Sequence, residues 1–408
     1  MVLSSLLCTR DKYLRLSKLT VQNFTHIFID QKPKSYRSKN TMNVDKSYEV
    51  EPLLLKYGGT RRFHMSQSVP QMQKKGKTIR PEVVNLRVIA VFGVLFGHST
   101  TIYWHNWDNY NTFVQSPILS HVENLGMLIL ALWMMISGFC IGFTFEHNWS
   151  FKEFFVRRFT RLIVPYFLVG ALWMVPIRML LHYPNYANES YWYIVWKYII
   201  LDYDSGQLWF LPTVFSYSIF LWIAQKFLCT SWVRDILLLF FGVCLLLVPI
   251  IYHGPGSSVV HMPMFSPLFY YFTFFMIGFI VYNHENDIKR VMKAPILFIG
   301  AILMIISIIF MYLGRGRIGL QLIAVWGCLI ILFFIMPHTT NRFTRAIADV
   351  SLGVYLFHEP LAFISYTYWP DIDPLLMVSI NFFLWGTVAS IISYLVFVLP
   401  KRLMRKNA

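Results

Sequence analysis

An apolar stretch between residues 85 and 98 carries one permanent cation, Arg87, and one titratable imidazole, His98. Eleven positions at about 100° per residue make three helical turns with about 20° left over, so both side chains leave the same face of a helix. The rise between them is about 16 Å, about half of a hydrocarbon core roughly 30 Å thick. Ionisable groups at such depth are costly and usually face a polar cavity, which indicates a functional site. The alternative is structural: the arginine reaches the headgroups and the histidine caps a neighbouring helix.

Composition places this stretch in a membrane. Hydrophobic residues make up 56% of the 408-residue chain and charged residues only 14%. Soluble globular domains carry about 25% charged residues, so we expect an all-α polytopic membrane protein. The five cysteines show no spacing typical of a metal site or a disulfide framework, and no metal is expected.

The apolar runs predict about ten transmembrane helices, each close to the length that a bilayer requires. They are expected at 83–103, 124–145, 161–181, 208–225, 235–252, 265–282, 294–313, 318–336, 350–368 and 375–399. Fifteen lysines and arginines lie in the short loops and the tail on one side, against Arg178, Lys197, Arg315 and Arg317 on the other. This positive-inside bias predicts that both termini are cytoplasmic. The net charge of +16 is therefore a topology signal, and nucleic acid is not an expected partner.

The chain divides into three parts by composition. Residues 1–82 hold sixteen lysines and arginines against six acidic residues, with no apolar run that could span a membrane and no signal-peptide pattern. They are expected to form a flexible cytoplasmic arm that lies on anionic headgroups. Residues 83–400 are the expected transmembrane domain, and residues 401–408 are a basic cytoplasmic tail.

The predicted outer loops are rich in tyrosine and tryptophan, and Asp202 and Asp204 precede the segment that contains Gln207 and Trp209. Aromatic residues are typical of membrane interfaces, which explains much of this pattern. The other interpretation is a carbohydrate platform, in which rings stack on sugars and polar side chains bond their hydroxyls. Asp202, Asp204, Gln207 and Trp209 are therefore candidate substrate-binding residues.

Two further groups of ionisable residues stand out. Arg157 and Arg158 lie four and three positions before Arg161 at the start of the third span, so they can converge with it on one helical face. Guanidinium groups grip phosphates in a bidentate way, although simple positive-inside anchoring predicts the same residues. In the ninth span, His358 and Glu359 lie near the depth inferred for His98. Their alternative role is a structural hydrogen bond between helices.

Five segments, taken together and in order, resemble the acyltransferase 3 family of bacterial integral-membrane O-acyltransferases of surface glycans. They are Asn85-Leu86-Arg87 with His98, Met135-Ile136-Ser137-Gly138-Phe139, Val156-Arg157-Arg158 with Arg161 and Pro165-Tyr166, Leu208-Trp209-Phe210-Leu211-Pro212, and Ser351-Leu352-Gly353-Val354-Tyr355-Leu356-Phe357-His358. The resemblance covers about residues 83–400. Val88 stands where the family usually has glycine, and Glu359 separates a histidine and a proline that often adjoin. The basic arm is also unusual.

The resemblance implies a multi-pass protein of the bacterial inner membrane that uses a cytoplasmic acyl-CoA, expected to be acetyl-CoA, and acylates a sugar of a cell-surface polysaccharide or lipopolysaccharide O-antigen. Arg87 and His98 are then essential, and Arg87, Arg157, Arg158 and Arg161 are expected to hold the CoA phosphates. His98 can act as a general base, with Glu359 or His358 orienting it. An acyl-imidazole intermediate is the other route. Candidate donors to the oxyanion are Ser137 and Gln207.

A transporter or flippase for a lipid-linked sugar is the rival interpretation, because it would also place histidine, arginine and glutamate at the midplane. The sequence shows no clear internal repeat, and its charged positions cluster in the Arg87–His98 span. These features favour the enzyme.

Overall fold

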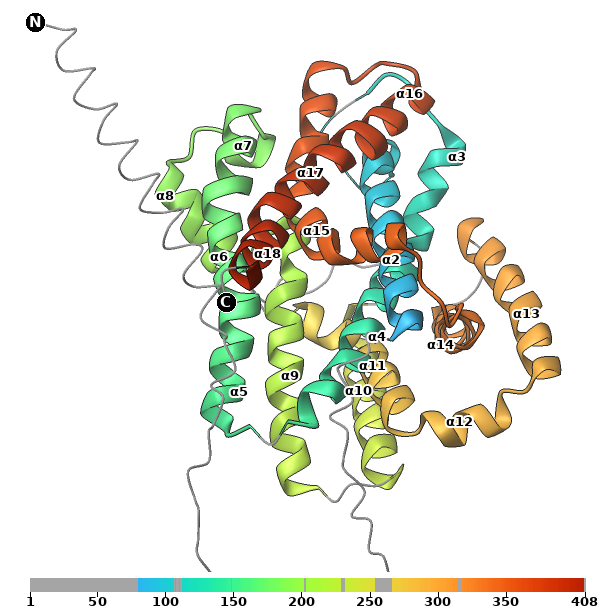
Figure 1. The fold of residues 1–408 in the computed structure, drawn as a ribbon. Coiled ribbons are helices and arrows are strands. Elements are labelled where there is room, and N and C mark those ends of the chain that lie inside the picture. The colour runs from blue at the N-terminus through green and yellow to red at the C-terminus, as the bar shows by residue number, and fades with distance from the viewer. Residues whose placement is uncertain are drawn as a thin grey trace, which may run out of the picture.

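The computed structural model describes residues 80–406, except 106, 108–109, 111, 148, 202, 229–231, 254–265 and 315–317. The described residues form helices and connecting turns, with no strand among them (Figure 1). The expected N-terminal arm lies almost wholly outside them, and so does Asp202.

Seven helices or continuous helical runs in this part of the chain are long and apolar enough to cross a membrane. They are Pro81–Tyr103, Pro117–Phe145, Phe151–Leu180, Gly206–Phe227, Ala294–Tyr312, Arg342–Tyr368 and Pro374–Met404. Each of the other three predicted spans overlaps a helix, namely α10 (Trp232–His253), α11 (Ser266–Asn283) and α14 (Ile318–Ile335). The all-helical membrane fold is thus confirmed, while ten spans and cytoplasmic termini stay predictions.

Helix α15 (Arg342–Tyr368) crosses the middle of the bundle (Figure 1). It begins at a capping box. The Asn341 side chain accepts a hydrogen bond from the Thr344 backbone N–H, and the Thr344 hydroxyl accepts one from the Asn341 backbone N–H. One face packs on α2 (Pro81–Thr100) and another on α17 (Gly386–Ser393). Because α15 is largely buried, its polar side chains must find partners inside the protein.

Helix α2 is continuous from Pro81 to Thr100, so the expected phase between Arg87 and His98 holds in the structure. Pro81 suits the first turn, where its missing N–H has no intrahelical partner to lose. On the side that faces α4 (Gly126–Phe145), the Trp133 indole donates a hydrogen bond of 3.0 Å to the Ala90 carbonyl.

The contact between α4 and α11 depends on two glycines. A Cβ atom on Gly138 would lie 1.8 Å from the Phe275 carbonyl oxygen, and one on Gly278 would lie 1.9 Å from that of Met135. Only glycine permits backbones to approach this closely. The Met135–Phe139 segment therefore contains a packing site.

The third helical run consists of α5 (Phe151–Arg158), α6 (Val164–Val169) and α7 (Val175–Leu180), joined by π-helical turns at Phe159–Ile163 and Gly170–Met174. Each π turn is followed closely by a proline, Pro165 or Pro176, which lacks an amide donor and crowds the preceding turn. The run delivers Arg178 to the interior with only 1% of its surface exposed. Counting Arg178 as an outer-loop cation was therefore wrong, since it lies within a helix among other helices.

The remaining helices surround this core. They are α3 (Pro117–Ser120), α8 (Tyr191–Ile194), α9 (Phe210–Phe227), α12 (Glu285–Val291), α13 (Ala294–Tyr312), α16 (Pro374–Ser379) and α18 (Leu399–Lys406). Helix α13 stands at the edge of the bundle against α14 (Figure 1). Its apolar side chains are mostly exposed, as expected of a helix that faces lipid.

Candidate active site

His98 lies in the last turn of α2 beside a cavity of about 210 Å³. About a quarter of its side-chain surface, 26%, is accessible, so a bound molecule can reach the imidazole. The Tyr366 hydroxyl donates to the His98 backbone carbonyl and ties this end of α2 to α15. The backbone of His98 is thus fixed by the contact between α2 and α15, while its imidazole faces the cavity.

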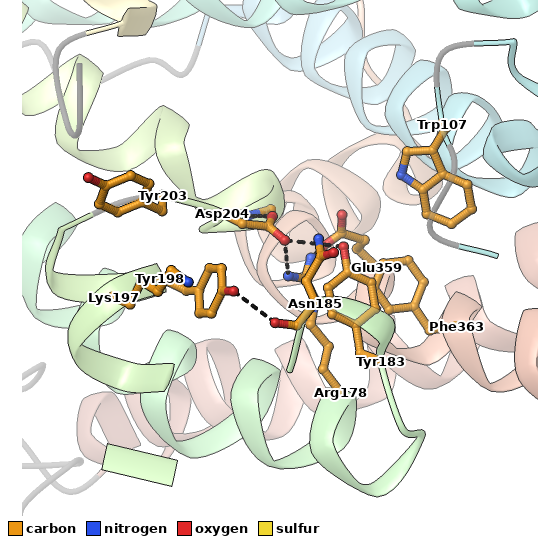
Figure 2. A pocket seen from close by; sticks show the side chains of 11 residues that line it. Trp107, Arg178, Tyr183, Asn185, Lys197, Tyr198, Tyr203, Asp204, Glu359 and Phe363 are labelled. Carbon is orange, nitrogen blue, oxygen red and sulfur yellow. Dashed lines mark hydrogen bonds and ion pairs between the residues drawn. The ribbon is translucent and has the colours of Figure 1, made fainter. Parts of the chain in front are cut away.

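A chain of charged groups leads from this imidazole across the bundle. The Oε1 atom of Glu359 on α15 lies 3.9 Å from Nδ1 of His98. The other carboxylate oxygen lies 3.1 Å from Nη2 of Arg178 on α7, and Nη1 of Arg178 lies 3.4 Å from Oδ2 of Asp204. Figure 2 shows how Arg178 lies between the two carboxylates.

The formal charge of this chain of groups depends on the protonation of His98. One guanidinium faces two carboxylates, which leaves a formal charge of minus one. Protonation of His98 brings the group to neutrality. At 3.9 Å the Glu359 oxygen is beyond hydrogen-bond range of the imidazole but close enough to stabilise an imidazolium that forms during a reaction.

Gly206 makes room for the central ion pair. A Cβ atom at this position would lie 2.5 Å from Nη2 of Arg178 and 2.6 Å from Oε2 of Glu359. Its φ angle of +53° is also one that residues with a side chain rarely adopt. Glycine is therefore favoured here both by its φ angle and by the space that the ion pair occupies.

Aromatic rings enclose the guanidinium of Arg178. Its Cζ atom lies 4.7 Å from the ring centre of Tyr183 and 5.1 Å from that of Phe363, within the range of cation–π contacts. The Tyr183 hydroxyl donates to Oδ2 of Asp204 at 3.1 Å. Burial, with the negative charge of Asp204, raises the pKa of Tyr183 above its ordinary value, so the hydroxyl keeps its proton. Burial also raises the pKa of the nearby Tyr186 to about 12.

His358 touches His98 directly. The two rings meet edge to face with their centres 5.0 Å apart. Nδ1 of His358 lies 2.9 Å from the carbonyl of Val354 and 3.0 Å from that of Tyr355, so this nitrogen carries the proton and donates. Nε2 is buried and has no partner among the described residues. His358 therefore packs against the candidate base with a free acceptor nitrogen.

Gln207 has a structural partner as well as a place in the cavity. Pro360 lacks an amide hydrogen, which leaves the carbonyl of Leu356 without its helical donor. Nε2 of Gln207 donates to that carbonyl at 3.0 Å, while its Oε1 is buried with no partner among the described residues. The Tyr355 hydroxyl donates to the Gln207 backbone carbonyl. Gln207 and the neighbouring Trp209 both line the cavity beside His98.

A second, larger cavity of about 510 Å³ lies on the Arg178 side (Figure 2). It is lined by Trp107, Arg178, Tyr183, Asn185, Lys197, Tyr198, Tyr203, Asp204, Gly206, Glu359 and Phe363. Gly206 and Glu359 line both cavities, so the carboxylate lies where the two adjoin. Asp204, a candidate substrate-binding residue, is among its lining residues.

Three of the four predicted donor-site arginines, Arg87, Arg158 and Arg161, lie close together. Nη2 of Arg87 lies 3.2 Å from Sγ of Cys140, and Nη2 of Arg158 donates to the Thr144 hydroxyl at 2.8 Å. Arg161 lies close enough to Arg87 and Arg158 for their charges to repel one another. The guanidinium of Arg157 stacks instead on Trp149 at 4.6 Å.

None of these four arginines forms an ion pair with a carboxylate in the described part of the chain. Positive charges held close together without a counter-charge are a site for an anion. From Arg87 the helix rises about 16 Å to His98. The structure thus separates Arg87, Arg158 and Arg161, the arginine group, from the candidate base, with Arg87 and His98 on the same helix.

Ser137 stands apart from this arrangement. Its hydroxyl donates to the carbonyl of Trp133, one turn earlier in α4, at 2.9 Å. It lines neither of the two cavities.

Sequence reasoning missed Arg178 and Gly206 as members of the site. The available signal was a cation inside an apolar run, at position 178, in a chain that also holds the acidic residues Asp204 and Glu359. Buried carboxylates need a partner, and Arg178 is the cation that the fold brings to them.

These features define an integral membrane protein whose bundle holds an accessible histidine, a buried ion-pair network and two adjoining cavities. The family model described as an acyltransferase domain, that of the acyltransferase 3 family, matches residues 81–400. The chain therefore belongs to the acyltransferase 3 family of membrane acyltransferases, and the resemblance seen in its motifs is confirmed. No curated protein and no solved structure matches the chain.

Proposed function

We propose that the protein is a membrane O-acyltransferase that moves an acyl group from cytoplasmic acyl-CoA to a sugar hydroxyl on the opposite side of the membrane. The observation that carries this proposal is the position of His98. Its imidazole is accessible in one cavity and lies 3.9 Å from Glu359, whose carboxylate also lines the second cavity. A base in one cavity, next to a carboxylate shared with the second cavity, can serve a donor in the first and an acceptor that reaches it from the second.

In the proposed step, His98 removes the proton of the acceptor hydroxyl as the oxygen attacks the thioester carbonyl. The new carbon–oxygen bond forms and the carbon–sulfur bond breaks. The imidazolium returns the proton to the departing thiolate, which leaves an ester and free CoA. Glu359 stabilises the imidazolium, and Arg178 holds Glu359 in place. The route through an acyl-imidazole passes through the same residues.

The arginine group supports acyl-CoA as the donor. Arg87, Arg158 and Arg161 have converging charges and no carboxylate partner among the described residues, which suits the phosphates of CoA. Arg157, beside them on α5, is free to contribute once it leaves Trp149.

The larger cavity supports a sugar acceptor. Its tyrosine and tryptophan rings offer flat apolar faces, while Asn185, Lys197 and Asp204 offer hydrogen-bonding groups. We propose a cell-surface polysaccharide or lipopolysaccharide O-antigen as the acceptor, and the bacterial inner membrane as the location. The basic loops then face the cytoplasm, where acyl-CoA is available.

The test uses purified protein, acyl-CoA labelled in its acyl group and a lipopolysaccharide preparation as acceptor. Release of the CoA thiol and transfer of label are both measured. We expect the variant His98→Ala to bind CoA and to lose at least about 100-fold in transfer rate, as removal of a general base does. The variant His105→Ala, which changes an exposed histidine just beyond the same helical segment, is the control and should retain activity.

Two results would overturn the proposal. One is a His98→Ala protein that transfers label at the wild-type rate. The other is movement of a lipid-linked sugar across vesicles by the wild-type protein without an acyl donor and without thiol release, which would support a transporter.

A further inference from the structure

The cavity beside His98 differs in character from the larger one. Apart from His98, Gln207, Tyr355 and Glu359, it is lined by aliphatic side chains, tryptophan rings and glycines. We propose that the apolar part of the cavity binds the acyl chain of the donor thioester, that it accepts chains longer than acetyl, and that Gly97 keeps it open to the chain. This inference rests on the proposed acyltransferase function.

The cavity offers an acyl chain a path that starts beside His98. Along α2 the cavity runs from His98 past Gly97 to Gly93, a rise of about 8 Å. Ile129 and Leu130 of α4 form the facing wall. A thioester carbonyl beside His98 would therefore have apolar surface next to it for its chain.

The size of the cavity argues against a small acyl group alone. An apolar cavity of about 150 Å³ is known to hold a benzene ring, which has six carbon atoms. The cavity beside His98 measures about 210 Å³. An acetyl group, with two carbons, would leave most of it empty and lose the contacts that its walls offer. Each additional buried methylene is worth about fourfold in binding.

The larger cavity is a poorer place for such a chain. The walls there include the charged groups of Arg178, Lys197 and Asp204, which an apolar chain would separate from water without bonding to them. The two cavities thus suit different substrates: the smaller one suits the apolar chain of the donor, and the larger one suits a polar acceptor.

Gly97 and Gly126 are the two positions in the cavity wall at which an added side chain meets open space. The nearest atom to a Cβ built at Gly97 is in the Trp104 ring at 4.0 Å, so a side chain would enter open space. At Gly93 the space is tighter, since a Cβ would lie 3.2 Å from Ile129. Gly126, on the opposite wall, has nothing within 4 Å.

The experiment measures kcat/KM of the purified protein with acetyl-, butanoyl-, hexanoyl- and octanoyl-CoA. We expect wild type to use hexanoyl-CoA at least about tenfold better than acetyl-CoA, since four added methylenes are buried. Gly97→Val should lower hexanoyl transfer by tenfold or more and acetyl transfer far less. Gly126→Val should shift the profile in the same direction from the other wall. Gly327→Val, which changes an exposed glycine of α14 that has nothing within 4 Å and lines neither cavity, should keep the wild-type profile.

The outcomes separate this inference from the function on which it rests. No transfer with any acyl-CoA contradicts the acyltransferase proposal itself. Transfer that is best with acetyl-CoA, or that does not depend on chain length, overturns the acyl pocket alone. The acyl pocket is also overturned if Gly97→Val and Gly126→Val both fold, as judged by thermal stability, and keep the wild-type dependence on acyl-chain length.

Discussion

Arg178 and Glu359 are 181 positions apart in the chain, yet Nη2 of the arginine lies 3.1 Å from Oε2 of the glutamate in the interior of the bundle. The arginine comes from α7 and the glutamate from α15, so this ion pair joins two of the helical runs. Its carboxylate is also the group that faces His98. The pair therefore links the packing of the bundle to the chemistry of the site.

Removing one member of this pair leaves a buried charge without a partner. We expect Arg178→Met to destabilise the protein by roughly 3 kcal/mol or more and to lower acyl transfer strongly. The double variant Arg178→Met with Glu359→Gln should recover stability, because no uncompensated charge remains, while activity stays low. Thermal unfolding of the purified variants and the CoA release rate measure the two effects. Equal stability losses in the single and double variants would contradict the pairing.

Gly206 provides a matched test of space at the site. Gly206→Ala adds a methyl group at φ +53°, only 2.5 Å from Nη2 of Arg178. Gly314→Ala adds one at φ +65°, where the nearest atom is in Asn124 at 3.3 Å and the residue lines neither cavity. Both changes carry the left-handed backbone cost of roughly 1–2 kcal/mol.

We expect only the Gly206 variant to lose acyl transfer, because only there does the methyl group displace the ion pair. Activity and thermal stability of the two variants decide the matter. Similar activity losses would mean that the backbone strain, and not the contact with Arg178 and Glu359, is responsible.

The arginine group should act on donor binding and not on the chemical step. Replacing Arg158 or Arg161 by alanine is expected to raise the KM for acyl-CoA about tenfold, as loss of a charge-assisted phosphate contact does, with little change in kcat. Added salt should raise the wild-type KM as well. Arg345→Ala, which changes a cation bonded to Thr340 outside this group, is the control. A fall in kcat with unchanged KM would remove these arginines from the donor site.

Much of the fold could be predicted from the sequence because its signals are local. Apolar runs of membrane length predicted the helices, and the eleven-residue phase between Arg87 and His98 survives because α2 is unbroken. Glu359 was expected near the depth of His98, and its carboxylate lies 3.9 Å from the imidazole.

The partners of Glu359 could not be predicted, because their approach depends on how distant helices pack. Arg178 was counted as a loop cation since it lies near the end of an apolar run, and nothing local distinguishes a buried guanidinium from an interfacial one. The role of Gly206 could not be predicted either, because it depends on side chains from two other helices. The Met135–Phe139 motif was predicted for its serine, whereas its glycine makes the close contact.

The end of the bundle that holds Arg80 offers a test of pH dependence. Glu285 accepts from Arg80 at 2.6 Å and pairs with Lys289 at 2.6 Å. Burial alone would raise the pKa of Glu285, but the hydrogen bonds and charges of these two cations outweigh it and hold the pKa below the ordinary value of 4.5. A carboxyl with a lowered folded-state pKa stabilises the protein above its unfolded-state pKa and loses that effect as the pH falls through the folded-state value.

We therefore expect Glu285→Gln to lower thermal stability at pH 7, with the difference from wild type shrinking as the pH falls below about 4.5. Asp287→Asn removes the exposed pair with Arg290 and should change stability little at any pH. Unfolding temperatures of the three proteins from pH 3.5 to 7 provide the measurement. A difference that grows toward low pH would reverse the assigned sign.

The close approach of α4 and α11 gives the most direct prediction about the Met135–Phe139 motif. Gly138→Ala places a methyl group 1.8 Å from the Phe275 carbonyl oxygen, and Gly278→Ala places one 1.9 Å from the Met135 carbonyl oxygen. Backbone atoms cannot yield as a flexible side chain does, so the helices must separate and the packed interface is lost. We expect both variants to yield little folded protein in size-exclusion profiles of detergent extracts. Gly327→Ala, with nothing within 4 Å, should behave as wild type, and Ser137→Ala should keep transfer activity because its hydroxyl bonds within its own helix. Folded but inactive Gly138→Ala protein, or inactive Ser137→Ala protein, would assign the motif to catalysis after all.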